Sequence, residues 1–145
     1  MIISFLVDGF ISKYAPYSIL SLVSLIFLSK KNLKKYYLEA FILGLLFDYF
    51  YSNTFFYNSF IFLETAFLIK KFQEKISSNF LNFLLIVILI VINYYTVCFI
   101  ILALIKYISF DIERYIYVTL NSVELNLILA IIMYLINKKR HKINW

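Results

Sequence analysis

One uninterrupted apolar segment constrains this chain more than any other feature. It runs from Phe80 to Ile105 without a charged residue. As a helix it would be about 39 Å long, which exceeds the roughly 30 Å hydrocarbon core of a bilayer. The whole chain follows the same trend, since 63% of its 145 residues are hydrophobic and 15% are charged. A soluble domain of this size could not bury so much apolar surface, whereas a membrane removes the need.

Five further apolar segments accompany this one, so we predict an all-α, polytopic integral membrane protein with about six transmembrane helices in a single domain, residues 1–145. The first two segments are short for full spans. Lys13 and Pro16 lie between them and favour a turn and two spans, although one long helix kinked at Pro16 also fits. The predicted spans are approximately 2–12, 16–29, 36–51, 55–69, 80–105 and 115–136, and a basic tail follows at 137–145.

The basic residues predict an orientation. The formal net charge is +6, which can indicate nucleic-acid binding, but the basic residues form short clusters between apolar segments. Such clusters are typical of cytoplasmic loops under the positive-inside rule. With the 30–35 loop, the 70–79 loop and the tail in the cytoplasm, 11 of the 14 basic residues lie on that side. We therefore expect a multi-pass membrane protein with both termini cytoplasmic and no nucleic-acid partner. With five spans, the N-terminus alone would change sides.

Three acidic residues fall within or near the predicted spans: Asp48, Glu64 and Glu124. An ionised carboxylate in hydrocarbon is costly, so each should face protein, water or a polar partner. Gly44 and Asp48 are four residues apart and share a helix face, where Gly44 permits another helix to approach closely. These groups could form a polar track for a substrate or proton. The lack of mid-span basic residues favours contacts between helices or with a partner's helix.

Chemistry-bearing residues are scarce. His141 lies in the basic tail, and Cys98 lies in an apolar segment without the basic setting that activates a thiolate. Walker, zinc-binding and nucleophile-elbow motifs do not occur in the sequence. We therefore expect no enzymatic activity, no cofactor and no metal.

Two short motifs resemble the rod shape-determining protein MreD family. The first is Ala-Pro-Tyr-Ser-Ile-Leu around Pro16, which matches the proline-led second span of that family. The second is Ala40 to Asp48, which contains the family's Gly-Leu-Leu-x-Asp core at Gly44 to Asp48. Tyr17 departs from the family, which commonly has an acidic residue there. The candidate helix-contact or partner-binding residues are thus Pro16, Gly44, Asp48, Glu64 and Glu124.

The resemblance implies a non-catalytic subunit of the bacterial cell-elongation complex in the inner (cytoplasmic) membrane. Such a subunit would bind MreC and help to couple MreB filaments, indirectly, to peptidoglycan synthesis by the RodA polymerase and its transpeptidase. It would be similar in fold to the substrate-binding subunits of energy-coupling-factor transporters. A vitamin-binding subunit of that kind is the main alternative, although 2 glycines poorly supply the small-residue faces such subunits use. An unrelated small membrane protein is a third possibility. For a partner contact, Asp48→Ala should weaken assembly more than Asp8→Ala.

Overall fold

The computed structural model describes residues 19–28, 32–52, 56–75, 79–106, 108–109 and 111–140. The first predicted span, 2–12, lies outside these residues, as do Asp8 and Pro16. Every regular element in the described residues is helical, which confirms the all-α prediction. The elements are α2 (Leu20–Leu28), α3 (Leu33–Phe47), the π-helix η1 (Asp48–Ser52), α4 (Tyr57–Lys75), α5 (Phe80–Leu104) and α6 (Ile112–Arg140).

The two C-terminal helices are the longest. By length and composition, two of the described helices could cross a membrane, namely α5 and the Ile112–Ile136 part of α6. Helix α3 has 15 residues and spans only about 22 Å. Helix α6 continues beyond the predicted end at 136 into the basic tail, because lysine and arginine are good helix formers outside an apolar setting.

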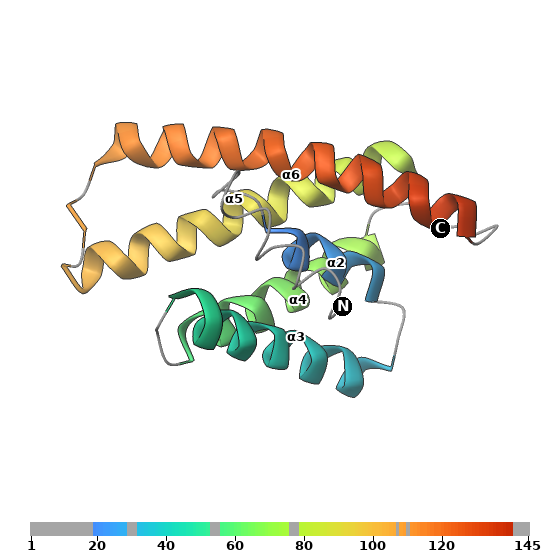
Figure 1. Ribbon diagram of the computed structural model, residues 1–145, viewed down its shortest axis with the longest axis horizontal. Helices are drawn as coiled ribbons and strands as arrows, with labels where there is room; N and C mark the ends of the chain where they lie inside the picture. Colours follow the sequence, from blue (N-terminus) through green and yellow to red (C-terminus); the bar gives the residue numbers. More distant parts are fainter. Residues whose placement is uncertain are drawn as a thin grey trace.

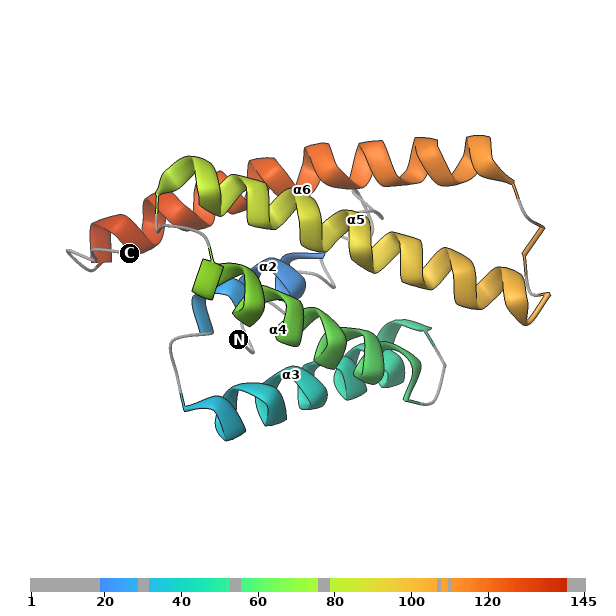
Figure 2. The same ribbon diagram turned by 180° about the vertical axis from the view of Figure 1, so that it is seen from behind.

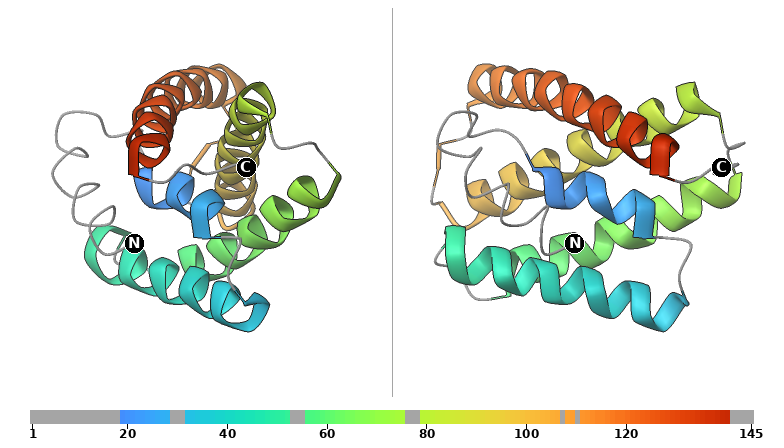
Figure 3. Two further views of the ribbon diagram at one scale, coloured as in Figure 1. Left: turned by 90° about the vertical axis from the view of Figure 1, so that its right-hand side faces the viewer. Right: turned by 45° about the vertical axis from the view of Figure 1, so that its right-hand side comes forward.

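The helices form two layers with α2 between them (Figures 1 and 2). Helices α5 and α6 run antiparallel in one layer, and α3 and α4 run antiparallel in the other. Helix α2 contacts α3, α4 and α6, and Figure 3 shows it enclosed between the layers. It is apolar on nearly all sides, and Leu22, Val23 and Leu25 are completely buried. A helix that is hydrophobic all round belongs in a core.

The two ends of the molecule differ in charge. The first turn of α3, the last turn of α4 and the end of α6 lie together at one end, on the right in Figure 1. We call this the basic end; its residues include Lys34, Lys35, Lys70, Lys71, Lys75, Lys138, Lys139 and Arg140. At the other end lie the end of α5, the start of α6, η1 and the start of α4. We call it the hairpin end, and its described basic residues are Lys106 and Arg114.

Candidate functional site

Helices α3 and α4 touch through their backbones at Gly44. A Cβ atom added to Gly44 would lie 2.4 Å from the Cα of Ser59 and 2.7 Å from both the Asn58 carbonyl oxygen and the Ser59 nitrogen. These are backbone atoms of α4, so they cannot rotate away as a side chain could. Only glycine therefore allows this approach, as expected for a small residue at a helix contact in a membrane protein.

Asp48 lies one turn after Gly44 and binds the start of α4. Its Oδ1 accepts hydrogen bonds from the Asn58 backbone N–H at 2.9 Å and the Asn58 Nδ2 at 3.0 Å. Its Oδ2 accepts from the Ser59 backbone N–H at 3.1 Å and the Ser59 hydroxyl at 2.9 Å. The first N–H groups of a helix lack partners within the helix and carry partial positive charge. Asp48 supplies both the acceptor and the opposite charge, which explains how a carboxylate that is 2% exposed is stabilised.

The backbone changes its winding where Asp48 begins. Helix α3 ends at Phe47, and Asp48 starts the five-residue π-helix η1. The Asp48 N–H donates to the carbonyls of both Gly44 and Leu45. A π-helical turn is wider than an α-helical turn and is found mainly in short pieces, often at functional sites. Here it lies directly at the carboxylate that holds the next helix.

The Asp48 network continues into α5 through Asn58. The Tyr94 hydroxyl donates a 2.7 Å hydrogen bond to Asn58 Oδ1, while Asn58 Nδ2 donates to Asp48. Asn58 and Tyr94 are both buried. Asp48, Asn58, Ser59 and Tyr94, which we call the polar junction, therefore link the α3–η1 boundary, α4 and α5. Because these atoms are occupied by one another, the junction suits holding helices together better than binding a substrate.

Comparison with known proteins identifies the chain. A family model described as rod shape-determining protein MreD matches residues 1–140. The chain belongs to the MreD family. The resemblance based on Pro16 and on the Gly44-to-Asp48 core is therefore confirmed. No curated protein and no solved structure matched the chain. Membership makes this a membrane protein of a rod shape-determining family, which is not a known enzyme family.

A second polar contact fastens α2 in this MreD family member. Asn126 of α6 is completely buried, and its Oδ1 accepts a 2.9 Å hydrogen bond from the Ile19 backbone N–H just before α2. Its Nδ2 donates to the Ser122 carbonyl at 2.8 Å. Asn126 thus provides the start of α2 with an acceptor that an apolar side chain could not offer.

Glu64 and Glu124 are not part of the polar junction. Glu64 is exposed on α4, and its Oε2 accepts a 2.8 Å hydrogen bond from Asn93 Nδ2 of α5. Glu124 is exposed on α6. Pro16 lies outside the described residues. Of the four predicted residues that the structure describes, it therefore brings together only Gly44 and Asp48. Across the described ranges, His, Cys, Asp and Glu form no group of three that could hold a metal.

Sequence reasoning missed the partners of Asp48. Asn58 and Ser59 follow the short polar break at 52–54, where a new helix was expected to begin, and this was the available signal. Two polar residues in the first turn of a helix are natural partners for a carboxylate at the end of the preceding one. No comparable signal marks Tyr94, because nothing in the order of residues shows which face of α5 meets α4.

Proposed function

We propose that this protein is a non-catalytic membrane subunit of the bacterial cell-elongation complex that binds MreC and helps to control cell shape and peptidoglycan synthesis. The family match over residues 1–140 carries this proposal. Through MreC the subunit would act indirectly with MreB filaments and with the RodA polymerase and its transpeptidase. The satisfied polar junction supports a scaffold, since its carboxylate holds helices in place.

The proposed topology has six spans and both termini in the cytoplasm. It is supported by the basic residues of α3, α4 and α6, which come from three separate parts of the chain and lie at the same end of the molecule. Positive charge of this kind is retained on the cytoplasmic side. The hairpin end, with Lys106 and Arg114, would then face outwards.

Single-cysteine labelling tests this orientation. In a Cys98→Ser background, Lys75→Cys and Lys106→Cys place one thiol at each end of the molecule. A membrane-impermeant maleimide added to intact spheroplasts should label Lys106→Cys at once and Lys75→Cys only after permeabilisation. The reverse pattern, or equal labelling of both variants, would reject the orientation.

The surface around exposed Glu64 and its half-buried partner Asn93 is the best candidate for the contact with MreC. The two residues lie near the middle of α4 and α5 and bridge these helices. A carboxylate exposed at mid-membrane depth is costly unless another polar group covers it. A partner helix that carries a hydrogen-bond donor at this depth would do so. Gly44 and Asp48 contact α4 of the same chain, so changes there would affect assembly through the fold.

Co-purification in detergent tests the partner and this surface together. Wild-type protein should retain MreC, and Glu64→Leu should reduce the recovered MreC by at least about threefold, the lower end for a polar contact between membrane helices. Glu74→Leu is the matched control, since Glu74 is also an exposed acid on α4 but lies at the basic end. Equal recovery in Glu64→Leu and Glu74→Leu would reject the surface without rejecting the partner.

Depletion in a rod-shaped host tests the function itself. Cells that lose the protein should become round, because the elongation complex would no longer assemble. Normal rods together with no MreC contact would rule the function out. The alternative of a vitamin-binding transport subunit is not favoured by the family match. A vitamin retained by the purified protein would reopen it.

A further inference from the structure

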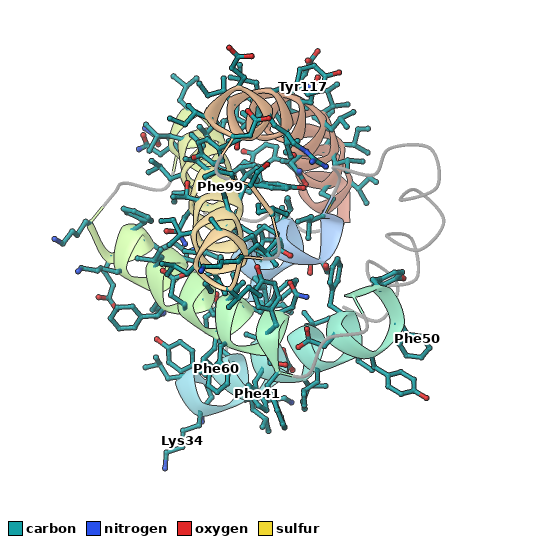
Figure 4. The ribbon with its side chains drawn as sticks, turned by 90° about the vertical axis from the view of Figure 1, so that its left-hand side faces the viewer. Lys34, Phe41, Phe50, Phe60, Phe99 and Tyr117 are labelled. Atoms are coloured by element: carbon teal, nitrogen blue, oxygen red, sulfur yellow. The ribbon has the colours of Figure 1, made fainter. Side chains whose placement is uncertain are left out.

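A cavity of about 250 Å³ lies between α5 and α6 near the hairpin end of the molecule. Apolar and aromatic side chains form most of its wall. Figure 4 views the molecule from this end, and Phe99 lies there on the side of α5 that faces α6. The lining residues include Tyr95, Cys98 and Leu102 of α5, Ile108 of the connection, and Val118 of α6.

Two polar groups distinguish this cavity from a packing defect. Thr119 lines it and is 7% exposed, yet its hydroxyl has no hydrogen-bond partner. A buried polar atom without a partner is rare and indicates a missing one. Arg114 also lines the cavity, from the exposed first turn of α6, where its backbone N–H donates to Asp111 Oδ1 at 3.0 Å. The cavity therefore combines an apolar interior, one buried hydroxyl and one cation.

Contacts between α5 and α6 stabilise the wall of the cavity. The Tyr115 hydroxyl and the Thr96 hydroxyl share a 2.7 Å hydrogen bond. The ring of Tyr115 also lies 5.0 Å from that of Phe99. These contacts bridge α5 and α6 and fix the distance between the two helices beside the cavity.

We propose that this cavity holds part of an acyl chain of an anionic phospholipid, with the phosphate at Arg114 and a polar ester group at the Thr119 hydroxyl. Among the described helices, α5 and α6 are the two that are long and apolar enough to cross a membrane by themselves, which would put their connection at headgroup depth. At that depth the arginine can pair with the phosphate of an anionic lipid, and the apolar cavity beside it can take part of the lipid's acyl chain. The volume is below the roughly 300–1,000 Å³ of sites that enclose whole small molecules, which favours part of a chain. The inference does not depend on MreC binding.

Photo-crosslinking tests the proposal. The full-length protein is placed in nanodiscs of phosphatidylcholine with a trace of phosphatidylglycerol that carries a diazirine on one acyl chain. Adducts should concentrate on the peptides that line the cavity, 95–102 and 115–119. Phosphatidylcholine with the same diazirine chain should label these peptides about fivefold less, the factor that corresponds to about 1 kcal/mol for one basic side chain at a membrane surface.

Two pairs of variants separate the chain from the headgroup. Val118→Phe fills the cavity and should abolish the local adducts, while Leu120→Phe, on the exposed face of α6, should leave them unchanged. Arg114→Gln should remove the preference for phosphatidylglycerol, while Lys106→Gln, a cation of the same end that does not line the cavity, should keep it. Arg114→Gln changes an exposed side chain, so it remains informative if Val118→Phe does not fold.

Adducts spread evenly over all exposed helix faces, or unchanged in Val118→Phe, would overturn the proposal. Equal labelling of the wild-type cavity by the two lipids would do the same, because the charge of the headgroup would then play no part in binding. Loss of MreC recovery in the co-purification experiment would leave these lipid results unaffected. The failure of the two proposals can therefore be told apart.

Discussion

The α3–α4 pair and the α5–α6 pair solve the problem of helix packing in opposite ways. Helix α3 is short, approaches α4 to backbone contact at Gly44, and ends in a carboxylate with four donors. Helices α5 and α6 are long and strongly apolar, and they leave a cavity of about 250 Å³ between them near the hairpin end. Specific contacts thus concentrate in the pair with the shorter helices.

The physical reason lies in what a bilayer supplies. A long apolar helix is held across the membrane by its own hydrophobic surface, so it needs few specific contacts. A 15-residue helix is too short to be positioned in this way and depends on its neighbours. Close packing and buried hydrogen bonds provide that positioning, since lipid offers no hydrophobic drive between helices. Substitutions should therefore be most damaging at the α3–α4 contact and mildest at the α5–α6 connection.

Gly44→Leu should have the largest effect. The added side chain would overlap backbone atoms of α4, so α3 and α4 would have to separate and the Asp48 hydrogen bonds would break. We expect the free energy of unfolding to fall by more than about 3 kcal/mol, the upper range for overpacking. This would be seen as aggregation or a much lower melting temperature in detergent. Ile42→Phe, on the exposed face of α3, is the enlarged control and should behave like wild type. Similar melting of the two variants would show that the close contact is unimportant.

Asp48→Ala should have the next largest effect. It leaves the Asn58 and Ser59 N–H groups without their acceptor in a buried position, for a loss of about 2–3 kcal/mol. Asp111→Ala is the matched control, because Asp111 accepts the Arg114 N–H at the start of α6 but is exposed to solvent. That control should lose about 0.5–1 kcal/mol. Equal losses, measured as shifts in thermal unfolding, would contradict the importance of burial.

Much of this arrangement was readable from the sequence. The helical class follows from the apolar segments, and Gly44 and Asp48 follow from their spacing, since residues four apart share a helix face. The identity of the facing helix did not follow, because the order of residues does not show that Asn58 and Ser59 lie against Asp48. Nor did the cavity beside Thr119, since a cavity is an absence of atoms that spacing does not reveal.

Asn126→Ala should have a moderate effect and extends the comparison to α2. It removes the acceptor for the Ile19 N–H, so we expect a loss of about 1–2 kcal/mol. Asn121→Ala is the matched control on the same helix. Like Asn126, Asn121 donates to the carbonyl four residues earlier in α6, so this variant loses that bond within the helix without touching the bond to Ile19. If both variants melted alike, the contact between α6 and α2 would contribute nothing beyond a local hydrogen bond.

Lys106→Gly should have the smallest effect, and of opposite sign. Lys106 has a φ of 57° just after α5, a left-handed conformation in which glycine is favoured. Its exposed side chain does not line the cavity, so glycine should raise stability by up to about 1 kcal/mol.

Phe56, before α4, has a φ of 63°, but its ring stacks at 6.2 Å on that of Phe41. In Phe56→Gly the stability lost with this ring contact should therefore equal or exceed the stability gained from the relaxed backbone. A higher melting temperature in Phe56→Gly than in Lys106→Gly would mean that the start of α4 is no more tightly packed than the α5–α6 connection, because the side-chain contacts of Phe56 would then be dispensable.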